Sequence, residues 1–229
     1  MNLPELFYNG KPALPPQKDD LERLYKLITD NFILTVLEFG CGYSTFVIAD
    51  ALSENKRRWD ALENKPEVRN IYKFKFYSVD TNNEWLLELS NKLGNYHKSH
   101  FRHSSCLVSV FNQQLCHFYT KLPDIVPDFI YIDGPDPEQV GGHINGMTFR
   151  GRTPMSADLL LMEPTLIPGT MVLIDGRTNN ARFLINNLKR PWFECPTEED
   201  YTLLRLEEPK LGKINAVGRD ICKEFQTKN

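Results

Sequence analysis

The sequence predicts an α/β fold: a doubly wound, mostly parallel sheet of about seven strands, with helices on both faces and a C-terminal antiparallel hairpin. Short apolar runs alternate with helical patterns along most of the chain. The apolar runs are continuous, which is typical of strands buried on both faces. Several of these runs end in an acidic residue or a glycine. Ligands of such sheets bind outside the carboxyl ends of the strands.

The elements are expected in the following order. Residues 1–19 form an N-terminal arm, because the prolines within it resist both helix and sheet, and residues 20–229 form a single domain. The domain opens with a helix over 20–32, whose leucines recur at helical spacing behind an acidic cap. After this helix, strands are expected at 33–39, 73–80, 100–111, 128–133, 169–175, 192–195 and 201–208. Further helices are expected at 44–55, 82–93, 156–166 and 179–188. The strand at 100–111 is the weakest and runs into a loop or short helix.

Composition excludes several classes of protein. The 229 residues include 27 lysines and arginines against 30 aspartates and glutamates, so the net charge of −3 provides no field for binding nucleic acid. No apolar run approaches the roughly 18 to 20 residues of a membrane helix, and the N-terminus lacks the pattern of a signal peptide. The five cysteines form no CxxC pair, which favours a reducing compartment over a disulfide framework or a zinc site. We therefore expect a cytoplasmic protein without membrane or nucleic-acid partners.

A glycine turn follows the strand at 33–39, in the sequence EFGCGYST from Glu38 to Thr45. Gly40 and Gly42 allow the backbone to approach a ligand, and the helix that begins near Ser44 offers free amide groups. A dinucleotide-binding fingerprint has a third glycine where this chain has Thr45. The carboxylate of Glu38 would also repel a pyrophosphate. Both features argue against an NAD enzyme.

Glu38, Gly40 and Gly42 resemble the first motif of the class I S-adenosylmethionine-dependent methyltransferases, in which an acid precedes G-x-G at the end of the first strand. The resemblance implies a Rossmann-like fold and a turn that wraps the methionine part of the cofactor, with Phe39 and Ser44 in contact with it. A second acid of the family, which binds the ribose hydroxyls, corresponds to Asp80.

The same resemblance places further residues at the cofactor. Thr81 follows Asp80 directly, Ser105 at the end of the third strand would bond the adenine amino group, and Asp133 would lie beside the methyl group.

Two more strands end in aspartate, at Asp133 and Asp175. If these strands are neighbours, roughly 4.8 Å apart, both carboxylates converge beside the expected methyl group. They are predicted to be catalytic, by binding a divalent cation or orienting a substrate hydroxyl, with the capping of loops as the alternative. His143, in a glycine-rich stretch, is a third catalytic candidate, because histidine titrates near neutral pH.

These residues leave open whether the protein binds a magnesium ion. Metal-dependent O-methyltransferases of the catechol type, which the chain resembles here, carry an Asp-Asn pair after the fifth strand. In this chain Asp175 is followed by Gly176, so that Asn179 or Asn180 would have to replace the amide ligand. Arg150, Arg152 and Arg177 flank the same region and would suit a carboxylate or phosphate on the acceptor. The list of metal ligands stays undetermined.

The predicted activity is O-methylation of a small hydroxylated metabolite, with a sugar as the favoured acceptor, by in-line displacement from S-adenosylmethionine. One alternative comes from Asp133 to Pro137, DGPDP, which resembles a segment of the aminopropyltransferases; these enzymes use decarboxylated S-adenosylmethionine. Another is a cofactor-binding module without catalysis. The oligomeric state is open, with a homodimer among the alternatives.

Overall fold

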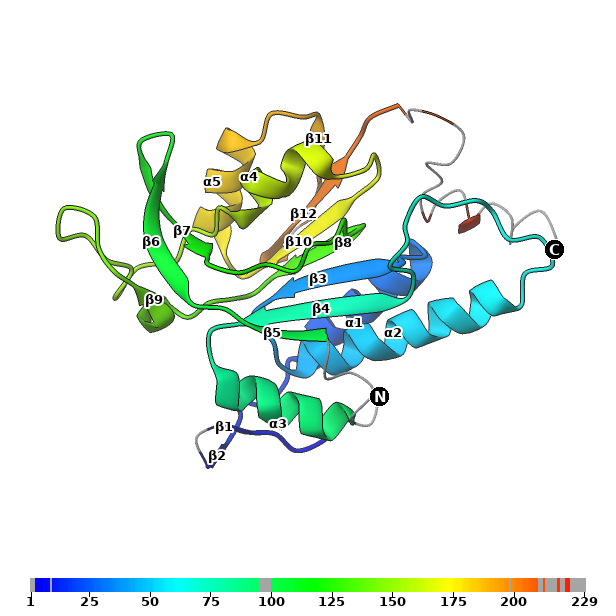
Figure 1. Ribbon diagram of the computed structural model, residues 1–229, viewed down its shortest axis with the longest axis horizontal. Coiled ribbons are helices and arrows are strands. Elements are labelled where there is room, and N and C mark those ends of the chain that lie inside the picture. The colour runs from blue at the N-terminus through cyan, green and yellow to red at the C-terminus, as the bar shows by residue number, and fades with distance from the viewer. Residues whose placement is uncertain are drawn as a thin grey trace.

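The molecule is built around one seven-stranded sheet, flanked on both faces (Figure 1). This computed structural model describes residues 3–8, 10–94, 100–197 and 199–209 and the single positions 212, 218, 221 and 222. The strand order is β11-β12-β10-β8-β3-β4-β5. The strands are β3 (Thr35–Phe39), β4 (Lys75–Asp80), β5 (Phe101–His103), β8 (Phe129–Ile132), β10 (Met171–Asp175), β11 (Trp192–Cys195) and β12 (Tyr201–Leu206).

The pairing confirms the predicted fold class. Strands β5, β4, β3, β8 and β10 are parallel neighbours, whereas β12 is antiparallel to both β10 and β11. The C-terminal hairpin predicted from the sequence is therefore present, with its second strand inserted next to β10. The chain reverses its direction along the sheet between β3 and β8, which is the topological switch point of such folds.

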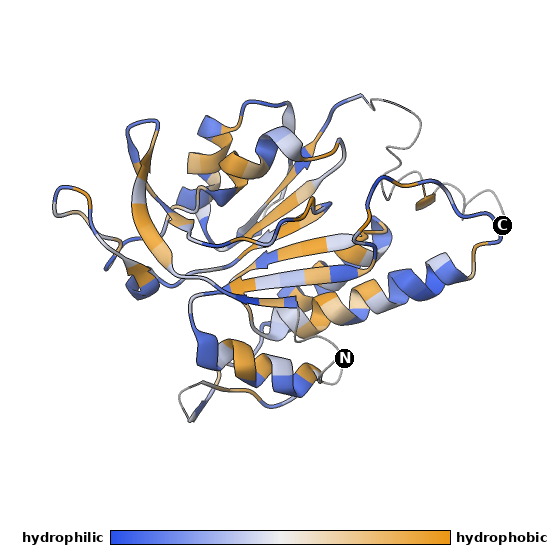
Figure 2. Ribbon diagram, in the orientation of Figure 1, coloured by the Kyte–Doolittle hydropathy of each residue, from blue (hydrophilic) through white to orange (hydrophobic). Residues whose placement is uncertain are grey.

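Hydrophobic residues make up much of the central strands (Figure 2). Alternate positions of a strand face opposite sides of the sheet. On one face Val36 packs with side chains of α1 (Lys18–Asp30) and α2 (Tyr43–Asp60). On the other face Leu37 belongs to a cluster with side chains of α4 (Asp158–Met162) and α5 (Thr178–Asn187). Helix α3 (Asn83–Leu93) lies beside β5. In the described part of the chain, no helix is long and apolar enough to span a membrane.

The strand predicted at 100–111 is wrong in its extent. The chain forms the short β5 and then a separate hairpin of β6 (Cys106–Phe111) and β7 (Gln114–Tyr119), which β9 (Val140–Gly141) extends to three strands. The turn residues Asn112 and Gln113 have φ values of 47° and 62°, the left-handed geometry of a two-residue hairpin loop. Cys106, Cys116 and Tyr119 of this hairpin belong to the buried cluster that includes Leu37. A β-hairpin thus takes the place of a crossover helix.

Two helix predictions also differ in length. The helix expected over 156–166 is only α4, followed by a 3₁₀ turn, η3 (Glu163–Thr165). Pro164 has no backbone N–H with which to continue the α-helix. Helix α2 extends to Asp60 and has Gly42 rather than Ser44 or Thr45 at its N-cap.

The N-terminal arm is folded against the domain. Its strands β1 (Phe7–Tyr8) and β2 (Lys11–Pro12) pair with each other. Leu6 is buried, and its carbonyl accepts a hydrogen bond from the amide of Ala13. The arm then passes into α1, which begins at Lys18. A second 3₁₀ turn, η2 (Pro137–Gln139), follows β8.

Candidate active site

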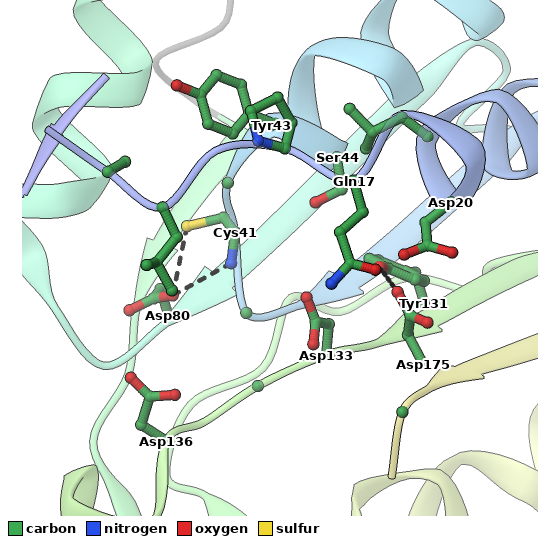
Figure 3. A pocket seen from close by; sticks show the side chains of 18 of the residues that line it. Gln17, Asp20, Cys41, Tyr43, Ser44, Asp80, Tyr131, Asp133, Asp136 and Asp175 are labelled. Carbon is green, nitrogen blue, oxygen red and sulfur yellow. Dashed lines mark hydrogen bonds between the residues drawn. The ribbon is translucent and has the colours of Figure 1, made fainter. Parts of the chain in front are cut away.

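A cavity of about 900 Å³ lies at the carboxyl ends of β3, β4, β8 and β10 (Figure 3). The glycine turn and Asp80 line one side, and Asp133 and Asp175 line another. Residues 11–17 of the N-terminal arm close it from a third direction. The volume is within the range of small-molecule sites, and the position agrees with the rule for parallel sheets.

Glu38 lies beneath the glycine turn, not in the cavity wall. Its side chain is fully buried and accepts hydrogen bonds from the hydroxyls of Ser44 at 2.6 Å and Thr45 at 2.7 Å, and from Ser78 on β4. Burial raises its pKa to about 7, although the three hydroxyls act to lower it. This carboxyl group therefore fixes the turn and the start of α2 from below.

Gly40 is required by a contact between two loops. Its φ is +80°, and a Cβ there would lie 2.6 Å from Cα of Gly134. A Cβ on Gly134 would in turn lie 2.5 Å from Cα of Gly40. At Gly42, by contrast, a Cβ would meet no atom within 4 Å. Gly40 thus serves packing between the ends of β3 and β8, whereas Gly42 leaves open space at the cavity.

Asp80 ends β4 and faces the cavity with a mostly buried side chain. It accepts hydrogen bonds from the amide of Asn82 at 2.8 Å and from the amide of Cys41 at 3.2 Å. Burial raises its pKa, and these amides act to lower it. Trp85 on α3 donates its indole N–H to the carbonyl of Cys41 at 2.6 Å. Asp80 is therefore held against the glycine turn with acceptor oxygens at the cavity wall.

Asp133 directly follows β8 and Asp175 ends β10, and these strands are paired, with Ile132 in register with Ile174. The predicted neighbourhood of these strands is confirmed. Tyr131 donates its hydroxyl to Asp175 at 2.6 Å. Burial raises the pKa of Asp175, and this hydrogen bond acts to lower it.

Asp133 lines the cavity, and 51% of its side chain is exposed. Burial of the carboxyl group raises its pKa to about 7, and the positive charge of Arg177 acts to lower it. The negative charges of Asp175 and Asp136 also act to raise it. Because half of the side chain meets solvent, we expect water to weaken this shift. Nε of Arg177 lies 3.9 Å from Oδ1 of Asp133, and its Nη atoms donate to the carbonyls of Asp133 and Pro135. A cavity-facing carboxylate whose pKa is raised above its ordinary value suits a general base.

The side chains around Asp133 and Asp175 do not fit a magnesium ion. Within the described ranges, no three histidine, cysteine, aspartate or glutamate side chains are grouped so that they could hold a metal. Asn180 is buried and exchanges two hydrogen bonds with the backbone of Ser156. Asn179 is exposed and does not line the cavity. The positive charge beside Asp133 is the guanidinium of Arg177.

Several sequence-predicted residues lie away from the cavity. His143 is exposed in a turn, where its Nδ1 accepts a 3.4 Å hydrogen bond from the amide of Gly146. Ser105 is exposed beyond β5, and Thr81 bonds Gln139 at 2.7 Å. Phe39 is buried against Tyr119. None of the predicted residues His143, Ser105, Thr81, Phe39, Arg150 and Arg152 lines the cavity, whereas Gln139, the partner of Thr81, does.

Sequence reasoning missed most of the wall that the N-terminal segment supplies. Gln17, Asp20 and Arg23 line the cavity from the start of α1, and Asp200 lines it from the loop before β12. The prolines before α1 were the available signal, because they hold an extended segment immediately ahead of a helix. Tyr131 gave no signal, since within an apolar strand a tyrosine looks like a core residue.

A family model described as a methyltransferase domain matches residues 37–176, which is more than half of the chain. The chain belongs to this methyltransferase family. The match runs from the glycine turn to the residue after Asp175 and confirms the family predicted from the sequence, that of the S-adenosylmethionine-dependent methyltransferases. A search of curated protein sequences gave no match.

Solved structures similar to this methyltransferase chain are remote. The O-methyltransferase TomG from Streptomyces achromogenes, in complex with SAM, has 12% identity and a TM-score of 0.47, and the alignment covers 86% of this chain and 84% of that one. An O-methyltransferase from Bacillus cereus, in complex with SAH, has 11% identity and a TM-score of 0.42 over the same shares. An RNA methyltransferase from Salinibacter ruber has 13% identity and a TM-score of 0.39, covering 89% and 100%. At such distances the acceptor of this chain has to be argued from its own residues.

Proposed function

We propose that this chain transfers a methyl group from S-adenosylmethionine to a hydroxyl of a small polyhydroxylated acceptor, with a sugar-like compound as the favoured class. One observation carries the proposal: a single cavity joins the glycine turn and Asp80 to the carboxylates of Asp133 and Asp175. The cofactor supplies an electrophilic methyl group when it is bound. The chain has to bind the cofactor, orient a hydroxyl and accept its proton.

The cofactor side of the cavity suits a nucleoside with an amino-acid tail. Asp80 offers carboxylate oxygens to ribose hydroxyls, which are donors that a carboxylate accepts well. Gly42 leaves room where any side chain would project toward the cavity. The indole of Trp85 also lines this side. These features support binding of the cofactor at this side of the cavity.

Asp133 is the proposed general base. Its carboxylate faces the cavity, and a pKa raised above that of a free aspartate makes it a better proton acceptor. When the acceptor oxygen forms its bond to the methyl carbon, the hydroxyl proton passes to Asp133 and the bond from carbon to sulfur breaks. A positioned base contributes about 10² to 10⁴ to such a rate. Arg177 is a positioning residue, because it holds the backbone of the loop that carries Asp133.

The acceptor end of the cavity is polar. Asp20, Arg23, Asp175 and Asp200 line it, and the ring of Tyr131 is 4% exposed and bonded to Asp175. At this end the ring of Tyr131 is not available for stacking on an aromatic acceptor, because the residue is nearly buried. A polyhydroxylated acceptor can exchange hydrogen bonds with each of these groups.

Calorimetry with S-adenosylhomocysteine tests the cofactor, and formation of that product from S-adenosylmethionine with sugar and phenol probes tests the acceptor. We expect micromolar binding, about −8 kcal/mol, and turnover of a sugar or polyol without added magnesium. Binding only of decarboxylated S-adenosylmethionine would replace the proposal by aminopropyl transfer. Binding without turnover of any probe would favour a non-catalytic module.

A further inference from the structure

Gln17 is the last residue before α1; its carbonyl accepts the amide hydrogen bond of Leu21, but its side chain makes no capping bond there. It occupies the N-cap, where serine, threonine, aspartate and asparagine are favoured because their side chains bond the free amides of the first turn. The Gln17 side chain makes no such bond. Its backbone is extended, with φ −79° and ψ 106°, directly after Pro15 and Pro16. The two prolines limit the backbone freedom of the segment that positions Gln17.

The Gln17 carboxamide points into the cavity between Asp133 and the bonded pair of Tyr131 and Asp175 (Figure 3). Its side chain is exposed to the cavity, and within the described part of the chain it has no hydrogen-bond partner. A side chain held at this place without a protein partner is available to a ligand.

The neighbouring groups give the carboxamide a distinct chemical role. Asp133 and Asp175 accept hydrogen bonds but do not donate them when ionised. Of the donors beside them, the Tyr131 hydroxyl is bonded to Asp175, and two N–H groups of Arg177 are bonded to backbone carbonyls. The amide of Gln17 both donates and accepts, which matches a hydroxyl group.

We propose that Gln17 is an acceptor-specificity residue, which binds a second hydroxyl of the acceptor next to the one that Asp133 deprotonates. The inference rests on the proposed function and deepens it, since it requires an acceptor with at least two neighbouring hydroxyls on a saturated ring or chain. The N-terminal arm thereby becomes part of the substrate site rather than a cover for it.

The test compares wild type, Q17A, Q17E and the neighbouring control K18A, whose exposed side chain does not line the cavity. The acceptor probes are methyl α-D-glucopyranoside, its 2-, 3- and 4-deoxy derivatives, and myo-inositol. We expect Q17A to raise KM for the accepted polyol by about 10- to 100-fold while KM for S-adenosylmethionine stays within about twofold. Q17E, which can only accept when ionised, should recover little. K18A should match wild type.

The deoxy probes separate recognition from a structural effect. In wild type, removal of the hydroxyl that meets Gln17 should cost about as much as Q17A does, and in Q17A the same removal should cost almost nothing. Equal losses in both proteins would overturn the inference, as would an unchanged KM for the polyol in Q17A. Turnover of none of the polyols by a protein that binds S-adenosylhomocysteine would overturn both the acceptor class and the role of Gln17. Absence of that binding would overturn the proposed function itself.

Discussion

Replacing Glu38 by glutamine tests whether the buried carboxyl group under the glycine turn is a source of pH-dependent stability. The folded protein holds this proton more tightly than the unfolded chain, because burial raises the pKa from 4.5 to about 7. The associated stability is therefore fully present below about pH 4.5 and is lost as the pH rises through about 7. The glutamine side chain has nearly the same shape and no charge to bury.

The size of the effect follows from the two pKa values. One pKa unit corresponds to about 1.36 kcal/mol, so the interval from 4.5 to about 7 corresponds to about 3 kcal/mol of unfolding free energy. Other buried carboxyl groups, such as Asp128 and Asp158, also have raised pKa values and affect both proteins alike. The difference between Glu38→Gln and wild type isolates the single group.

Urea unfolding at several pH values between 4.5 and 8, followed by tryptophan fluorescence, measures this difference. We expect the free energy of unfolding of Glu38→Gln to rise by about 3 kcal/mol relative to wild type across that range. Glu84→Gln, at an exposed position of α3, should run parallel to wild type. Parallel curves for Glu38→Gln and wild type would refute the reasoning, since they would mean that Glu38 is ionised in the folded protein throughout.

Three further outcomes are expected. Gly40→Ala should lower the free energy of unfolding by about 2 to 5 kcal/mol in urea, because φ is +80° and the added Cβ would meet backbone atoms. Gly42→Ala should leave the free energy of unfolding nearly unchanged, since a Cβ there meets no atom within 4 Å. Similar losses in both variants would contradict this. Asp80→Asn should weaken S-adenosylhomocysteine binding about 10- to 100-fold in calorimetry, and an unchanged affinity would remove Asp80 from the cofactor site. Arg177→Met should raise the pKa of Asp133 and shift the acidic limb of the kcat/KM profile upward by roughly one pH unit, whereas a downward shift would exclude Asp133 as the base.

The sheet could be predicted because its strands carry strong local signals. The strand segments that end at Phe39, Asp80, Ile132 and Asp175 are rich in apolar residues and bounded by turns, and each forms a parallel strand at the expected place. The hairpin of β6 and β7 carried a weaker signal, because its residues are buried to mixed degrees and Asn112-Gln113 is not a common turn pair. Here packing against the sheet decides the structure, and local preference does not.

The site was predictable where a strand end fixes a side chain and not where a loop does. Asp80, Asp133 and Asp175 line the cavity because parallel strands bring their carboxyl ends to one edge. His143 and Ser105 do not line it, since a side chain on a connection can face in any direction.

The contact between Gly40 and Gly134 connects the two sides of the proposed reaction. Gly40 belongs to the turn that we propose binds the cofactor, and Gly134 follows Asp133, the proposed base. With no side chain on either glycine, the two backbones are in direct contact. Alignment of the reacting groups can supply roughly 7 to 11 kcal/mol of a displacement barrier, provided that the geometry is held. A backbone-to-backbone contact at the end of β3 and β8 holds it more rigidly than side chains with free torsions could, which explains why both positions need glycine.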